Sequence, residues 1–492
     1  MPFPFVLPTT SSVSLAEFFS SSTHPSLPWA ATTARGVLRD VLKKHKRLPP
    51  QLQASDLSNV LVALNGYIPY LLALDAGLSG AEVAKEEIEI ALIKELEVEW
   101  RPTLTASLPG REPPRTKLRG LENEIFFVLS TLAQTHALLA RSQLHTLYNA
   151  TISASDKRAI AIASAMKSFL DANSIYNYLV ARSTPNPAAP AVVDIIQPVV
   201  SALAALTLAE ATMVTVLKDD PYPAVVAEDR NRDSKEWMIK NPEIPKVRAH
   251  LFARLCLAAA DHAAKAQAML GRASRVDESL TKYLDDLRRT ARGKACRFFG
   301  IDAELSGRTG EGIAWLRGAK KELGFASAGS DEERTVRGFT KFKREWAERR
   351  EDRKIESGGD WGSDAGRFEE GRVLDMLEKK WVKMNDTVSF ILRLISGYGN
   401  VDYTQMNVQL VPSSEPLLAS MPSGREYHIP KTHVPPTLDE GVIASMRAPP
   451  EPGEEAFQRE EADSSEEEGS KADPVGAFPG TRAEYSASTS YY

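Results

Sequence analysis

The side chains able to do chemistry in this sequence are few and lie far apart. Glu210 is the one acidic residue in an apolar stretch, 201–218, and could act as a general acid. A buried glutamate bonded to a neighbouring helix is the commoner case, and we expect that role here. His250, Cys256 and His262 share one helix-length stretch, where a Cys–His pair could supply a nucleophile. Their spacing of six residues places them on different helix faces, which argues against such a pair.

Motifs of metal, hydrolase and nucleotide sites are absent from the sequence. The eight histidines are scattered, and there is no HExxH, CxxC or GxSxG segment. The run Gly307-Arg-Thr-Gly310-Glu-Gly312 could cradle a phosphate, but it lacks the Lys-Ser/Thr of a P-loop and suits a turn into a helix. A transferase built on a helical array would need convergent acids or a metal cluster. The sequence therefore predicts a protein that is not an enzyme, with no catalytic, metal or cofactor site.

Two further segments could contact partners. Tyr222-Pro-Ala-Val225 resembles a YPx-aliphatic docking peptide, although it also suits a turn between helices. A helix predicted over 33–47 carries basic residues along one face: Arg35, Arg39, Lys43 and Lys46/Arg47. That face is either solvated or in peripheral contact with an acidic membrane surface.

These candidates must be positioned by helices, and the most informative of them is the stretch 201–218. It is apolar almost all the way round a helical projection, with only Glu210 and Lys218 charged. A helix that is apolar on every side is buried on every side. It is too short, and too rich in Ala and Thr, to span a bilayer. We therefore expect it to be the central helix of a large soluble helical core.

Most of the remaining chain also has the apolar pattern of helices. Helices are predicted over 33–47, 56–76, 121–141, 159–182, 246–270, 274–299, 310–323 and 368–395. Strict alternation in Leu96-Glu-Val-Glu-Trp100 predicts the single strand region, between 88 and 105, and 107–117 reads as a loop. The charged and Gly-rich segments around 335–366 are expected to bulge from the body. The pattern favours a mainly α fold of stacked helical hairpins, a TPR-like solenoid with a small β element.

Composition is that of a globular protein, with 492 residues of which 43% are hydrophobic and 25% charged. With only two cysteines, the sequence predicts no disulfide framework and suits a reducing compartment. The amino-terminal residues show no secretory signal. We therefore expect a cytoplasmic protein with protein partners and no nucleic acid.

The net charge of −5 is unevenly distributed. Residues 451–473 carry a local charge of −8, which leaves the rest of the chain at +3. A Pro-, Ser- and Gly-rich acidic segment buries too little apolar surface to order itself. We expect a folded domain over 10–440 and a disordered acidic tail over 441–492.

Several segments together resemble the Bro domain, the boomerang-shaped helical module of ALIX and its fungal relatives. No single motif is specific, but their order and spacing are similar over roughly residues 10–440. The matching segments are Gly120-Leu-Glu122 running into IFFVLSTLA, AMKSFLDANSIYNYL, LAALTLAEAT, ELEVEWRPTL, Gly310-Glu-Gly-Ile-Ala-Trp-Leu-Arg317 and Asn407-Val-Gln-Leu-Val-Pro412. ALIX and the palA-type protein carry a V-shaped coiled-coil arm after the domain, and no such arm is expected here. In this respect the chain resembles a fungal member of the family that acts as a pH-response regulator.

The resemblance implies a non-catalytic scaffold that binds the C-terminal amphipathic helix of the core ESCRT-III filament subunit. It further implies assembly with other ambient-pH pathway proteins at cortical (plasma-membrane) or endosomal ESCRT sites. That complex leads to proteolytic activation of the transcription factor pacC at alkaline pH by a separate cysteine protease. The alternative is a general endosomal-sorting or membrane-associated adaptor outside pH signalling.

The resemblance also implies where the partner helix binds. Two groove positions of the family match Leu251 and Leu255, and a third, aromatic in ALIX, aligns with Thr215. Residues i and i+4 share a helix face, so the two leucines can form one stripe. The competing interpretation is that both leucines pack inside the solenoid.

Overall fold

The structure is a computed structural model that describes residues 2–106, 112–148, 155–183, 192–223, 246–325, 361–395, 409–426 and 432–450. Contacts group the chain into Met1–Pro449, called the body below, and Pro450–Tyr492. The described residues are mostly helical, which confirms the predicted mainly α class. The charged segment expected around 335–354 and the acidic residues from 451 onward lie outside the described residues.

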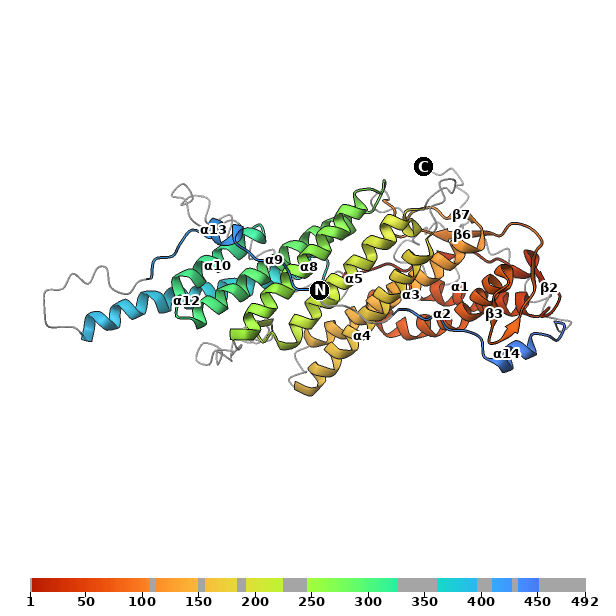
Figure 1. Cartoon of the computed structure of the whole chain (residues 1–492), viewed down its shortest axis with the longest axis horizontal. Helices are drawn as coiled ribbons and strands as arrows, with labels where there is room; N and C mark the ends of the chain where they lie inside the picture. Colours follow the sequence, from red (N-terminus) through yellow and green to blue (C-terminus); the bar gives the residue numbers. More distant parts are fainter. Residues whose placement is uncertain are drawn as a thin grey trace, which may run out of the picture. The chain divides into compact units, whose positions relative to one another are not determined.

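Long helices follow one another through the body, and each packs on the next in chain order (Figure 1). Their bounds are α1 Leu27–Arg47, α2 Pro50–Ser79, α3 Leu121–His145, α4 Ser155–Arg182, α5 Gln197–Asp219, α8 Lys246–Leu270, α9 Glu278–Leu305, α10 Thr309–Glu322 and α12 Arg367–Ile395. Two short helices come later, α13 Ser414–Ala419 and α14 Glu440–Ser445. This order of neighbours is that of stacked helical hairpins, as the sequence predicts.

The central helix α5 is a core helix. It packs against α4 on one side and α8 on the other. The hydroxyls of Thr207 and Thr212 donate to Leu203 O and Leu208 O, so these polar groups are satisfied inside the helix itself. α2 and α5 are both long and apolar enough to cross a membrane, but 72% of the most apolar window of α5 is buried in the body. The burial predicted for this stretch is confirmed.

Two large hydrophobic clusters lie along the described part of the body. The first joins the amino-terminal residues to α1–α5, the end of α8 and the beginning of α9, with Leu64, Phe127 and Leu203 almost fully buried. The second joins α8, the rest of α9, α10 and α12, and it contains Leu255 and Trp381. The second cluster therefore lies behind the proposed partner face on α8.

Three small antiparallel sheets flank the first helices. Strands β1 Thr9–Thr10, β6 Glu97–Arg101 and β7 Thr116–Arg119 form one sheet, in which Trp100 faces Thr10 and Thr116. The other two pair β2 Phe19–Ser21 with β5 Ile90–Leu92, and β3 Glu82–Val83 with β4 Glu86–Glu87. The single strand region predicted between 88 and 105 was therefore too narrow, and the loop predicted over 107–117 was wrong at Thr116 and Lys117. Strands of two to four residues are too short for alternation to reveal them.

The basic face predicted on the first helix is wrong at Arg35. This side chain is 1% exposed and donates to Glu124 Oε1 at 2.8 Å and to the carbonyl oxygen of Ser11 at 2.7 Å. Farther along the helix, Lys46 pairs with Glu112 at 2.6 Å. One predicted surface cation is thus a core residue and another is neutralised, which weakens the membrane-contact interpretation.

The Gly-rich segment does not bulge where it is described. Trp361 is 1% exposed, and its carbonyl oxygen accepts hydrogen bonds from the guanidinium of Arg141. Its ring lies edge-on to His145, 5.0 Å between centroids. Residues 361–366 therefore pack against α3, because one large aromatic side chain among the glycines supplies an apolar anchor.

The body extends beyond the boundary predicted at residue 440. Leu438, just before α14, and Ile443, on α14, are buried in the first hydrophobic cluster. Ser26 donates from its backbone N–H to Met446 O and from its hydroxyl to Ala448 O. Residues 441–449 consequently belong with the folded body and not with the acidic tail.

Truncation after Pro436 is accordingly expected to lower the free energy of unfolding by about 1–3 kcal/mol. It removes the buried side chains of Leu438 and Ile443, and the loss is offset in part by the entropy of the ordered segment. Truncation after Pro450 keeps these contacts and serves as the control. Thermal melting of both proteins checks this, and equal melting temperatures would contradict the packing role of α14.

Candidate functional site

The two predicted groove leucines differ in burial. Leu255 is 7% exposed and belongs to the second hydrophobic cluster. Leu251, one turn earlier on α8, is only half-buried and packs on the edge of that cluster. Leu251 is therefore the more accessible of the two, and Leu255 is part of the core.

Thr215 on α5 lies near the same face. Asp219 of α5 and Arg248 of α8 form an ion pair of 3.7 Å that is about half exposed at both side chains. Thr215 precedes Asp219 by one turn, and Leu251 follows Arg248 by one turn, so both residues lie on the face that the ion pair marks. Thr215 is half-buried, with its hydroxyl donating to Ala211 O at 3.1 Å. The predicted residues thus gather along the α5–α8 seam, with Leu251 as its apolar surface residue.

An extended arm, residues 409–426, borders this face. Its α13 packs on α10, and Met421 packs on the second cluster. Farther on, the Arg425 N–H donates to Arg254 O on α8 at 2.9 Å. Gly424 lies so close to α8 that a Cβ there would be 2.5 Å from Ala258 N, so this crossing requires glycine. The arm therefore covers the α8 surface next to Leu251 and Leu255.

The histidines and cysteines of α8 and α9 do not form a catalytic pair. Burial raises the pKa of Cys256 to about 12, and it also raises the pKa of Cys296, so both thiols stay protonated. His250 packs edge-on against the Phe299 ring, 5.7 Å between centroids. Burial, followed by Lys265, lowers the pKa of His262. Within the described part of the chain, no group of three or more His, Cys, Asp and Glu residues could hold a metal ion.

The Gly-rich turn before α10 binds the arm. The Gly310 N–H donates to Gln409 Oε1 at 3.0 Å, and Gln409 Nε2 donates to Gly307 O at 2.7 Å. A Cβ on Gly310 would be 2.6 Å from Leu410 O. The lack of a side chain at Gly310 therefore lets the arm approach closely. The Gly310 N–H, which a bound phosphate would need, is already hydrogen-bonded to the Gln409 side chain.

Glu210 is a buried residue bonded to neighbouring segments, as expected. Its Oε1 accepts from the Tyr283 hydroxyl of α9 at 2.6 Å and from the Phe3 N–H at 2.9 Å. Burial raises its pKa to about 7, and the two hydrogen bonds partly oppose that rise. Beside it, among the described residues, lies a cavity of about 50 Å³.

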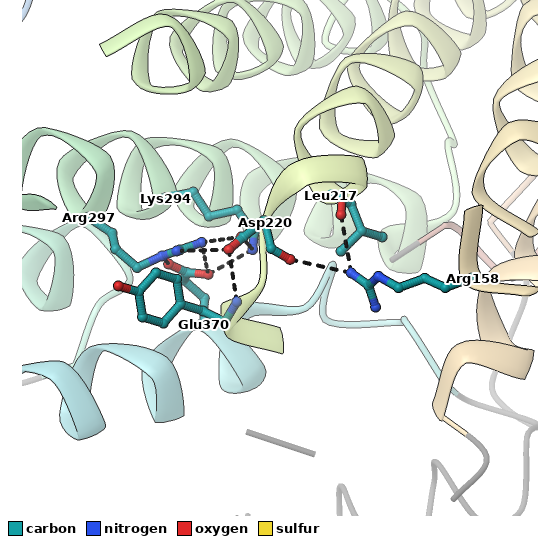
Figure 2. A network of polar contacts seen from close by, with 7 residues as sticks. Arg158, Leu217, Asp220, Lys294, Arg297 and Glu370 are labelled. Carbon is teal, nitrogen blue, oxygen red and sulfur yellow. Dashed lines mark hydrogen bonds and ion pairs between the residues drawn. The ribbon is translucent and has the colours of Figure 1, made fainter. Parts of the chain in front are cut away.

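A buried ionic network closes the carboxyl-terminal end of α5 (Figure 2). Arg297 of α9 donates to Asp220 Oδ2 at 2.5 Å and to Glu370 Oε1 of α12 at 2.6 Å. Lys294 of α9 pairs with Glu370 at 2.8 Å, and Arg158 of α4 donates to the carbonyl oxygens of Leu217 and Asp220. Asp220, Arg297 and Glu370 are each at most 1% exposed. The network is thus a structural junction of four helices.

The charges of the network hold one another ionised. Burial by itself would raise the pKa of Asp220, but Arg297 and Lys294 lower it below its usual value. Likewise, burial would lower the pKa of Lys294, and Glu370 raises it. Two carboxylates and two cations therefore balance one another at a largely buried site.

The docking-peptide interpretation of Tyr222 is contradicted by its burial. The ring is 5% exposed and lies 5.2 Å from the Arg297 guanidinium. Tyr222 N–H donates to Asp220 Oδ1 at 3.2 Å, as in a turn after a helix. Ala224 and Val225 lie outside the described residues.

Another buried carboxylate, Glu124, was not found by sequence reasoning. It accepts hydrogen bonds from Arg35 Nε at 2.8 Å, from the Tyr67 hydroxyl at 3.1 Å and from Trp100 Nε1 at 2.6 Å. It therefore joins α1, α2, β6 and α3 at one point. The sequence signal was weak, because Glu124 shares the first turn of α3 with Glu122, where acidic residues are ordinary.

Comparison with known proteins gives one strong relative. No family model matches the chain. The chain is 43% identical over 520 residues to the pH-response regulator protein palC of Emericella nidulans, covering 98% of this chain and 99% of that protein. Among solved structures it is similar to the ALIX BRO1 domain in complex with CHMP4C, with a TM-score of 0.48, 17% identity and coverage of 90% and 96%. It is also similar to a Bro1 domain described as a basis for endosomal targeting, with a TM-score of 0.42, 15% identity and coverage of 85% and 94%.

The sequence relative decides the assignment. It is matched along almost the whole of both chains, so the correspondence includes the helices, the arm and α14 together. Of the catalytic candidates, Glu210 is buried and accepts hydrogen bonds from Tyr283 and Phe3, and Cys256 and His262 are buried in α8. The chain belongs to the palC family of pH-response regulators.

Proposed function

We propose that this chain is a non-catalytic scaffold of a pH-response pathway. Its α5–α8 face binds the C-terminal amphipathic helix of the core ESCRT-III filament subunit. The observation that carries the proposal is the half-buried Leu251, which shares a helix face with the buried Leu255 and lies one turn from Arg248, the ion-pair partner of Asp219 on α5. Family membership supports the pathway assignment.

The chemistry of the face fits an amphipathic helix. Such a helix presents apolar residues at i, i+3, i+4 and i+7 to a groove and keeps its polar side in water. Leu251 offers an apolar contact, while the Asp219–Arg248 pair at the rim offers charges of both signs to flanking residues. Thr215 gives a smaller apolar contact than an aromatic ring, so we expect moderate affinity.

A scaffold of this kind works by bringing other proteins together. Bound to an ESCRT-III filament, the chain would be recruited from the cytoplasm to cortical or endosomal sites. There it would join other pathway proteins in the complex required for proteolytic activation of pacC at alkaline pH. The protease is a separate protein, in agreement with the structural roles of Glu210, Cys256 and His262 here.

Changing Leu251 to Asp is expected to weaken binding of the ESCRT-III helix about 30-fold. A central apolar anchor contributes roughly 2 kcal/mol or more at such interfaces, and a carboxylate cannot enter the partner's apolar stripe. The measurement is a fluorescence-anisotropy titration of a labelled peptide of that helix with the full chain.

The matched control is Val62→Asp. Val62 of α2 is 72% exposed, so the control places the same charge on an aliphatic surface residue of another helix. It should bind as the unchanged chain does. Binding of Leu251→Asp at full strength, with an unaltered melting temperature, would refute the groove assignment.

A further inference from the structure

The amino-terminal residues form a strap across the core. Residues 2–7 are called the strap below. The side chains of Phe3, Phe5 and Leu7 in it are at most 7% exposed, whereas Val6 is 62% exposed. The Phe3 ring lies edge-on to Phe5 at 4.9 Å and to Tyr283 of α9 at 5.2 Å between centroids. The strap thus fills a space beside α5 and α9 with aromatic side chains.

Glu210 is the polar anchor of the strap. Its Oε1 accepts the Phe3 N–H and the Tyr283 hydroxyl, so strap, α5 and α9 meet at one oxygen. Its Oε2 is buried, and it has no hydrogen-bond partner among the residues that the structure describes. Glu210 and Pro2 line the same cavity of about 50 Å³, room for a few water molecules. One of the two carboxyl oxygens therefore accepts no hydrogen bond from the described residues, which disfavours the charged form of Glu210.

The surroundings of Glu210 contain little to stabilise a negative charge. Tyr283 on α9 and Tyr176 on α4 face it as neutral hydroxyls, and burial and Glu210 raise the pKa of both. Across the cavity, Lys294 is already paired with Glu370, and Asp220 and Glu369 are acidic. Two charged groups of opposite sign also affect the pKa of Tyr283: Asp364 raises it and Arg141 lowers it.

Burial raises the pKa of Glu210 to about 7, opposed by Tyr283, by Phe3 and by the charge at the amino end of the chain. The ordinary pKa of this side chain is 4.5, so it is raised in the docked state. A raised pKa means that docking is strongest below pH 4.5 and weakens as the pH rises to about 7.

We propose that the strap and Glu210 form a pH-sensitive latch. The strap is docked while Glu210 carries a proton and loosens when Glu210 ionises, because opening lets water reach the carboxylate. A chain of this family would then carry its own alkaline-responsive element, separate from the α5–α8 face. Loosening exposes Phe3, Phe5 and Leu7 and uncovers the α5–α9 surface beneath them.

The magnitude follows from the two protonation equilibria. With a pKa of about 7 when docked and 4.5 when free, the docking equilibrium constant falls at most about tenfold between pH 6 and pH 8. Hydrogen exchange reports such local opening, and the strap amides available are those of Phe3, Phe5, Val6 and Leu7.

The test is hydrogen exchange by mass spectrometry on the full chain, tagged only at its carboxyl end, with the Glu210→Gln variant beside it. Glutamine keeps the shape and an acceptor oxygen but cannot ionise. The ratio of strap exchange in the unchanged chain to that in Glu210→Gln cancels the intrinsic effect of pH. We expect this ratio to rise up to about tenfold from pH 6 to pH 8.

Two further variants make the result decisive. Glu122→Gln removes a half-exposed carboxylate that pairs with Arg182, and it should keep the pH response of the unchanged chain. Phe3→Ala should raise strap exchange at both pH values. A ratio that stays constant between pH 6 and pH 8, or an equal pH response in Glu210→Gln, would overturn the latch.

Discussion

Replacing Arg297 with methionine is expected to lower the free energy of unfolding by about 3–5 kcal/mol. The guanidinium is fully buried and bonded to both Asp220 and Glu370, so its removal leaves carboxylates without their main cation. Lys294 can still neutralise Glu370 at 2.8 Å, but it is 3.9 Å from Asp220. Asp220 then stays buried beside a poor partner. Urea denaturation of the full chain at pH 7 measures the change.

Two comparisons separate the buried network from ordinary surface charge. Arg308→Met removes a half-exposed arginine that pairs with Glu311 and should change stability by less than about 1 kcal/mol. Adding Asp220→Asn to Arg297→Met should recover part of the loss, because the uncompensated charge is then gone. If Arg297→Met were no more costly than Arg308→Met, the network would contribute nothing net.

The helical core could be predicted because apolar periodicity is a local signal. The stretch 201–218 is buried inside the observed α5, since a helix without a polar face has no side to present to water. The bounds of the helix predicted over 246–270 agree with α8, because its apolar residues recur at helical spacing. The absence of a hydrophilic face on 201–218 was enough to place that stretch between other helices.

Features that could not be predicted from the sequence depend on contacts between residues far apart along the chain. Arg35 and Glu124 are 89 residues apart, and a basic residue on an amphipathic helix looks like a surface residue until its partner is known. The same holds for α14, whose Ile443 is buried against residues more than 300 positions earlier in the chain. The strap was predicted in part: Phe3 and Phe5 are possible anchors onto the body from the sequence alone, but their partner Glu210 lies 207 residues from Phe3.

The groove residues were only half predicted. A spacing of four residues places Leu251 and Leu255 on one face of the helix, but it does not reveal how deeply each side chain is buried. The structure puts Leu255 in the second hydrophobic cluster and leaves Leu251 half-buried at its edge. Their responses to the same substitution should therefore differ.

Leu255→Asp is expected to lower the free energy of unfolding by about 3–5 kcal/mol, whereas Leu251→Asp should cost about 1 kcal/mol. Leu255 is 7% exposed, so the new carboxylate would be buried with no cation placed to pair with it. The packing of the leucine side chain with the second cluster would also be lost. Leu255→Met keeps the volume and should cost less than about 1.5 kcal/mol. Chemical denaturation of the three proteins gives the comparison.

The pH dependence of the Leu255→Asp loss identifies its cause. Burial raises the pKa of an aspartate above its unfolded value, so the folded variant favours the protonated, neutral form. The stability deficit should therefore shrink as the pH falls from 7 towards 4, where the neutral form is available to both states. A deficit independent of pH would instead indicate lost packing alone. A deficit as small as that of Leu251→Asp would show that Leu255 is accessible and belongs to the binding surface.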